Sequence, residues 1–99
     1  MNHTSINPIN ITPKAKAEIQ KALQIKGIPE AYYLRIGLRG SACSAAYLIG
    51  FDKQEVHDQL YEIDGITVLI NKHHLMYLLG VTLDFEEEGN GFTFVKQTA

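Results

Sequence analysis

The sequence predicts a mainly β fold of the α+β class, an antiparallel sandwich or meander accompanied by about two helices. Three observations lead to this prediction. Short segments alternate between apolar and polar residues, consecutive segments are joined by tight turns, and residues 13–26 and 72–79 have helical spacing. About five or six strands are expected, and a regular strand-helix-strand order is absent from the sequence pattern.

The first part of the chain is read as a leader followed by a helix. Residues 1–10 are polar and are expected to form a flexible leader, before a single domain at residues 11–99. Thr12 is a suitable cap for the first helix, which carries Pro13 in its first turn. Gly27 and Pro29 are expected to end it.

The remaining chain alternates between strands and turns. Residues 32–38 and 47–51 are predicted strands, and the polar residues 52–59 are predicted to form a loop. The strongest local signal is a hairpin of residues 61–63 and 66–70 around Asp64-Gly65, a pair that favours a tight turn. Asn71 is a suitable cap for the second helix, and two more strands, residues 81–85 and 92–95, flank a turn at residues 89–91.

Composition favours a soluble globular protein, with 45% hydrophobic and 20% charged residues. The net charge is -2 and Lys and Arg form no run, so nucleic acid is not an expected partner. No apolar stretch reaches the roughly 20 residues of a membrane helix, which makes a cytoplasmic location the expectation. A domain of 99 residues often covers leftover apolar surface with a second copy, so a homodimer is expected.

The single cysteine, Cys43, lies in a run of small residues at positions 40–46. One thiol excludes an intramolecular disulfide and a zinc site built from paired CxxC motifs. Because the neighbouring side chains are small, Cys43 is expected in a loop between strands, next to open space. The alternative is that it behaves as a small buried hydrophobic residue.

The order of several motifs resembles the HesB-like family of A-type iron-sulfur cluster carriers, the group of IscA and SufA. The family's strand and cysteine loop are similar to Leu34-Arg35-Ile36-Gly37-Leu38-Arg39-Gly40-Ser41-Ala42-Cys43-Ser44-Ala45. Further landmarks follow in the family's order: Asp64-Gly65-Ile66-Thr67-Val68-Leu69-Ile70, Tyr77-Leu78 with Gly80, Leu83-Asp84-Phe85 and Gly91-Phe92-Thr93-Phe94. The resemblance spans residues 11–94 and implies a HesB-like domain.

This resemblance implies a non-enzymatic role in iron-sulfur cluster assembly, with Cys43 binding iron or a [2Fe-2S] cluster and with assembly or recipient proteins as partners. The family's Cys-Gly-Cys tail has no counterpart in residues 95–99, so two of the family's three thiolates are missing and weakened affinity is expected. The alternative is a degenerate interaction or regulatory domain that binds no metal. An enzymatic use of Cys43 as a nucleophile lacks an assignable base.

Other polar residues have two interpretations each. Arg35 and Arg39 either steady a thiolate or act as edge-strand charges that discourage aggregation. The run Glu86-Glu87-Glu88 is most simply a solvated turn.

The four histidines receive no firm metal assignment. His73 and His74 are neighbours at the start of a predicted helix, where adjacent side chains diverge, so both are interpreted as surface residues. His3 and His57 fall in segments predicted to be flexible and are auxiliary ligands at most.

Overall fold

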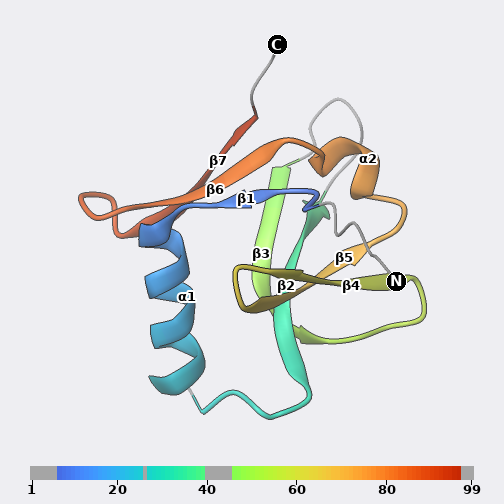
Figure 1. Cartoon of the computed structure of the whole chain (residues 1–99), viewed down its shortest axis with the longest axis horizontal. Helices are drawn as coiled ribbons and strands as arrows, with labels where there is room; N and C mark the ends of the chain where they lie inside the picture. The colour runs from blue at the N-terminus through green and yellow to red at the C-terminus, as the bar shows by residue number, and fades with distance from the viewer. Residues whose placement is uncertain (1–6, 26, 40–45, 97–99) are drawn as a thin grey trace.

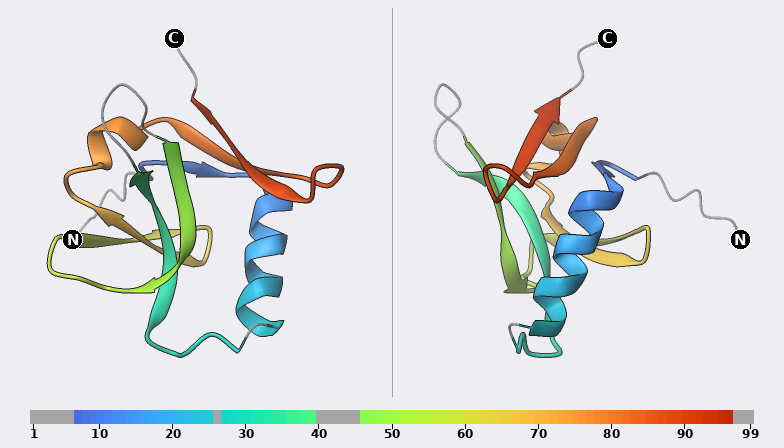
Figure 2. Two further views of the ribbon diagram at one scale, coloured as in Figure 1. Left: turned by 180° about the vertical axis from the view of Figure 1, so that it is seen from behind. Right: turned by 90° about the vertical axis from the view of Figure 1, so that its left-hand side faces the viewer.

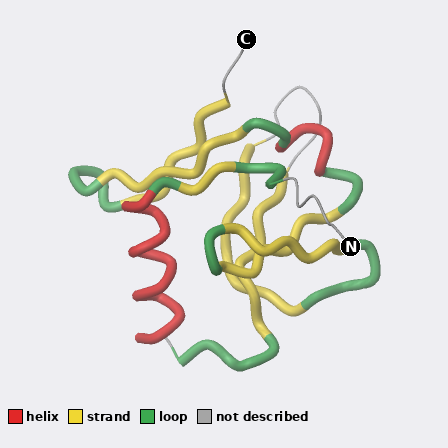
Figure 3. Tube along the Cα trace, viewed as in Figure 1, coloured by secondary structure: helices red, strands yellow, loops and turns green. Residues whose placement is uncertain are grey.

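The computed structural model describes residues 7–25, 27–39 and 46–96, and strands make up most of them (Figure 1; Figure 3). The two helices lie at opposite ends of this strand-rich body. In chain order the elements are β1 (Asn10–Ile11), α1 (Pro13–Ile25), β2 (Tyr32–Arg39), β3 (Ala46–Lys53), β4 (Asp58–Ile63), β5 (Ile66–Asn71), α2 (Leu75–Leu78), β6 (Val81–Glu86) and β7 (Gly91–Lys96).

The strands form two sheets. One has three strands in the order β1-β6-β7, and the other has four in the order β3-β2-β5-β4. Figure 2 shows α1 leading away from the three-stranded sheet, directly after β1. The mainly β class predicted from the sequence is confirmed.

Three antiparallel hairpins carry most of the pairing, as predicted: β2 with β3, β4 with β5, and β6 with β7. The turn between β4 and β5 has positive φ at both Asp64 (51°) and Gly65 (83°), the conformation that a tight two-residue hairpin requires. This turn matches the sequence prediction residue for residue.

Two parallel pairings were not predicted, β2 with β5 and β1 with β6. The apolar composition of β5 explains its pairing with β2. Ile66, Val68, Leu69 and Ile70 are all 3% exposed or less, so β5 is buried on both faces. A strand that is apolar on both faces belongs inside a sheet, and β5 therefore pairs on one side with β4 and on the other with β2.

One hydrophobic core joins the two sheets and the first helix. Its members share nearly complete burial and come from β1 and the residue before it, α1, β2, the end of β4, β5, α2 and β6. The largest fully buried side chains are Ile9, Ile19, Leu34, Ile36, Ile63, Leu69, Ile70, Leu78, Leu83, Val68 and Val81. Burial of each such side chain contributes on the order of 1.5–3 kcal/mol, which makes this core the main source of stability.

Thr12 caps α1 as predicted and also links the helix to the three-stranded sheet. The backbone N–H of Ala15 donates to Thr12 Oγ1 at 3.2 Å, and Thr12 Oγ1 donates to Asp84 Oδ1 on β6 at 2.7 Å. This hydroxyl, together with the N–H of Phe85, lowers the pKa of the Asp84 carboxyl. The cap therefore fixes both the start of α1 and its position against β6.

Two boundaries differ from the sequence prediction. The predicted loop at residues 52–59 shrinks to residues 54–57, because Asp58 is buried and begins β4. The predicted helix at residues 72–79 is limited to α2, since Asn71 Oδ1 accepts the N–H of His73 at 2.8 Å and shapes a turn before the helix.

The short strand β1 also had no sequence signal. Pro8 and Ile9, which fall within the expected leader, are buried, and the backbone N–H of Gly80 donates to the Pro8 carbonyl at 3.0 Å. Ile9 and Ile11 both enter the core. Among the described residues, no helix is long and apolar enough to cross a membrane.

Candidate functional site

Cys43, the predicted site residue, lies outside the residues that the structure describes. Its segment connects β2 to β3, whose ends are held in register by the pairs Arg39↔Ala46 and Leu38↔Tyr47. The described side chains that flank this connection are Arg39, Ala46 and Tyr47, together with His74 and Phe94, which contact β2 and β3. We call these five residues the loop rim.

The aromatic part of the loop rim joins the two sheets. The rings of Tyr47 on β3 and Phe94 on β7 stack with centroids 4.9 Å apart and planes inclined by 20°. Tyr47 remains 37% exposed, so one side of the stack faces solvent. Such a pair contributes roughly 0.5–1.5 kcal/mol beyond its buried area and fixes the start of β3 against β7.

His74 packs against β2, which corrects its interpretation as a surface residue. Its Nδ1 accepts a hydrogen bond from the backbone N–H of Leu38 at 3.3 Å, and the side chain is half-buried. Gly37 makes this approach possible, because a Cβ at position 37 would lie 3.1 Å from His74 Nδ1. The turn at Asn71 reorients His74 toward the sheet, and adjacency in sequence could not reveal this.

The hydrogen bond also determines what His74 can do chemically. Because Nδ1 accepts from Leu38, the neutral imidazole carries its proton on Nε2. His74 is therefore an N–H donor on its other side and offers no free nitrogen lone pair for a metal. The sequence signal that could have pointed to this contact is Gly37, a residue without a side chain in an otherwise bulky strand.

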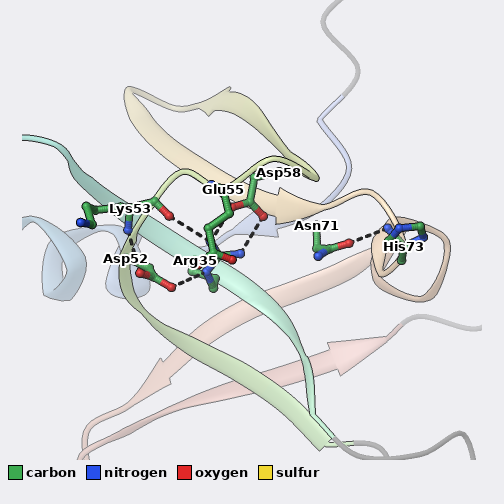
Figure 4. Close-up of polar contacts among 7 residues, drawn as sticks. All are labelled: Arg35, Asp52, Lys53, Glu55, Asp58, Asn71 and His73. Atoms are coloured by element: carbon green, nitrogen blue, oxygen red, sulfur yellow. Dashed lines mark hydrogen bonds and ion pairs between the residues drawn. The ribbon is translucent and has the colours of Figure 1, made fainter.

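Arg35 takes part in a polar cluster away from the Cys43 segment, and its interpretation as an edge-strand charge is wrong, whereas a contact with the thiolate falls on residues outside the described ranges. Its guanidinium donates to Asp58 at 2.7 and 2.5 Å, to Asp52 at 3.0 Å and to the Lys53 carbonyl at 3.2 Å (Figure 4). Its strand lies between β3 and β5, so Arg35 is not on a sheet edge. Arg39 is different, because it is exposed and lies beyond the residues of β2 that pair with β5, so its interpretation as a surface charge stays a prediction.

The charges in this cluster are mutually stabilised. The Asp58 side chain is 1% exposed, and its pKa is lowered, first by the hydrogen bonds from Arg35 and then by the backbone N–H of Glu55. Asp58 in turn raises the pKa of the Arg35 guanidinium. Since both groups are ionised and bound to each other, the cluster holds β2, β3 and β4 together rather than offering a free ligand.

The remaining polar residues are largely at the surface. Glu86 ends β6, Glu87 and Glu88 lie in the following turn, and all three are exposed, as the solvated-turn interpretation predicted. His73 and His57 are exposed too, while His3 lies outside the described residues. Within residues 7–25, 27–39 and 46–96, His, Cys, Asp and Glu form no group of three or more that could hold a metal.

Comparison with known proteins identifies a matching family and several relatives of this chain. The model of the family described as iron-sulphur cluster biosynthesis matches residues 7–99. An uncharacterized protein of the nifU 5' region of Azotobacter vinelandii is 40% identical over 92% of this chain and 88% of its own. The iron-binding protein IscA of Enterobacter sp. (strain 638) is 37% identical over 87% of this chain and 82% of its own.

Solved structures show the same fold. Escherichia coli SufA, described as involved in biosynthesis of iron-sulfur clusters, superposes with a TM-score of 0.74 and 22% identity over 99% of this chain and 90% of its own. A crystal structure of IscA with the [2Fe-2S] cluster superposes with a TM-score of 0.66 and 23% identity over 92% of this chain and 86% of its own. The family match and the shared fold lead to one conclusion: this chain belongs to the iron-sulphur cluster biosynthesis family.

Proposed function

We propose that this chain binds iron or a [2Fe-2S] cluster through Cys43 and passes it on during cluster assembly, holding it weakly. The observation that carries the proposal is that Cys43 is the only thiol in the 99 residues of a member of this family. Thiolates are the protein ligands of iron-sulfur clusters. The IscA structure with a [2Fe-2S] cluster supports the same cargo for a chain of the same fold.

The ligand count explains why binding should be weak. A [2Fe-2S] cluster takes four protein ligands, whereas this sequence supplies one thiol per chain. Two copies meeting at their Cys43 segments would provide two thiolates, and a small thiol or a partner protein would complete the set. An incomplete protein ligand set makes the cluster labile, which suits delivery to a recipient protein.

A homodimer is supported by exposed apolar residues near the loop rim. Met76 is 75% exposed, Tyr77 58%, Leu79 47% and Val95 55%. Lys96 Nζ donates to the Tyr77 carbonyl at 3.2 Å, so the end of β7 lies against α2. We call Met76, Tyr77, Leu79 and Val95 the α2–β7 patch, and infer that a second copy of this chain covers it.

The loop rim would assist Cys43 through charge. Arg39 is exposed at the end of β2, four positions before Cys43 in the chain. A nearby cation favours the thiolate over the thiol, and the thiolate is the form that binds metal. In this role the chain acts by binding and not by catalysis, with assembly or recipient proteins as its partners, and with neither nucleic acid nor membrane.

The second candidate is an interaction or regulatory domain that binds no metal. The single thiol favours it, together with the lack of any group of three potential ligands in the described part of the chain. Both candidates share the fold, so the presence of bound iron separates them.

Anaerobic reconstitution with ferrous iron and sulfide tests the proposal. The parent should develop visible charge-transfer absorbance and take up iron, whereas Cys43→Ser should do neither because its thiol is gone. Ser44→Ala, in the same segment, is the matched control and should behave like the parent. Equal uptake by Cys43→Ser would refute the role of the thiol, and no uptake by the parent would favour the metal-free domain.

A further inference from the structure

We propose that His57 and His73 form a second metal site, one that takes a single divalent transition-metal ion and does not involve Cys43. The two rings have centroids 5.1 Å apart and meet edge to face, with planes inclined by 64°. Both residues are exposed, so solvent and metal ions can reach the pair. The imidazole nitrogen is a common ligand for divalent ions such as zinc, copper, nickel and ferrous iron.

The hairpin of β4 and β5 brings these residues together, although 16 positions separate them in sequence. His57 directly precedes β4 and His73 follows β5 by two residues, and the strand ends are paired through Asp58↔Asn71. The backbone N–H of Lys72 donates to the His57 carbonyl at 2.9 Å, which holds the two segments side by side. The register of the hairpin therefore sets the spacing of the rings.

A second contact fixes the backbone of His73. The Asn71 side-chain oxygen accepts the N–H of His73 at 2.8 Å, as Figure 4 shows. Because the backbone around both histidines is already hydrogen-bonded, a metal would order little more than two side chains. Two imidazoles whose backbone segments are already held together lose less conformational freedom on binding than two independent histidines would.

Neighbouring groups do not complete a full ligand set. The Asp58 carboxylate, next to His57, is engaged by Arg35, and Lys72 adds a positive charge beside His73. No third His, Cys, Asp or Glu of the described ranges joins the pair to form a group. A bound ion would keep its other coordination positions for water or for a ligand from outside, so the site would be open and exchangeable.

Zinc titration by calorimetry, carried out in a Cys43→Ser background, tests this site without interference from the thiol. The parent should bind one zinc ion per chain. His57→Ala and His73→Ala should each weaken binding at least about tenfold, because the second ligand of a pair binds intramolecularly. The double variant should lose little more than either single one.

Two controls make the result specific. His73→Phe keeps an aromatic ring beside His57 but removes the nitrogen, and should lose zinc as His73→Ala does. His3→Ala should bind zinc like the parent. The proposal is overturned if His73→Phe retains parental affinity, if the two single losses are small and additive, or if the parent binds no zinc. Because Cys43 is absent throughout, none of these outcomes depends on the proposed function.

Discussion

The guanidinium of Arg35 and the carboxylate of Asp58 form a two-point ion pair across the four-stranded sheet, with hydrogen bonds of 2.7 and 2.5 Å. The Arg35 side chain is 14% exposed and that of Asp58 1%. Such a pair holds β2 and β4 in place only while both partners are present, since a buried charge without its partner is strongly unfavourable.

Removing the Asp58 carboxylate should therefore cost far more folding stability than removing that of Asp52, the other carboxylate bound to Arg35. Asp58→Ala leaves Arg35 largely buried without its main partner, and should lower the free energy of unfolding by about 3–5 kcal/mol. Asp52→Ala removes a carboxylate that is 46% exposed, and should cost about 1 kcal/mol or less. Urea denaturation of both variants measures the difference, and equal losses would contradict the assigned role of Asp58.

The same pair should make stability depend on acidity. Arg35 lowers the pKa of Asp58 in the folded state, so the unfolded chain binds more protons as the pH falls below the ordinary carboxyl pKa of about 3.9. The contribution of Asp58 is thus complete above that value and is lost as the pH falls through the lowered pKa. The stability of Asp58→Asn should approach that of the parent in acid. Urea denaturation at several pH values measures the difference in unfolding free energy between the parent and Asp58→Asn. A difference that stays constant between neutral pH and strong acid would argue against this linkage.

Gly37 should be required for the contact between His74 and β2. Gly37→Ala places a Cβ 3.1 Å from His74 Nδ1, so the ring must shift and the Leu38 N–H loses its acceptor. Losing this part-buried hydrogen bond should cost on the order of 1 kcal/mol. Gly50→Ala is the matched control, because a Cβ there meets no atom within 4 Å. Thermal unfolding should show a lower melting temperature for Gly37→Ala only. A Gly37→Ala variant as stable as the parent would contradict the role assigned to the contact between His74 and β2.

Self-association through the α2–β7 patch should be sensitive to charge. Met76→Glu places a charge within a patch proposed to be covered by a second copy, and should shift the protein toward the monomer. Val56→Glu is the control. It alters a residue that is 84% exposed in the loop between β3 and β4, outside the patch, and should leave self-association unchanged. Sedimentation velocity separates the two cases. A Met76→Glu variant that associates as the parent does would exclude this patch as the interface.

Local signals predicted much of this fold. The Asp64-Gly65 turn, the Thr12 cap and the alternation of Leu34 and Ile36 are each decided by a few adjacent residues, and the structure confirms them. The parallel pairing of β2 with β5 depends on contacts between distant residues, which alternation in one strand does not encode.

The candidate site, like the fold, has features that the sequence predicts and features that depend on contacts between distant residues. Small residues and a single cysteine pointed to the segment after β2, but that segment lies outside the described residues, so Cys43 as the site residue stays a prediction. The contact of His74 with Leu38 was missed because it depends on the turn at Asn71. The sequence does not reveal the partner of Arg35, because Asp58 is 23 positions away and lies in a polar stretch that predicts a loop.

Native mass spectrometry of the anaerobically reconstituted protein tests the central proposal most directly, because it counts chains, iron and sulfide in one species. Cys43 as the sole protein thiol predicts an ion containing two chains and one [2Fe-2S] cluster, with any small-thiol ligands adding their own mass. Cys43→Ser should yield only cluster-free chains. A cluster retained by Cys43→Ser, or one held by a single chain of the parent without added ligands, would contradict the account.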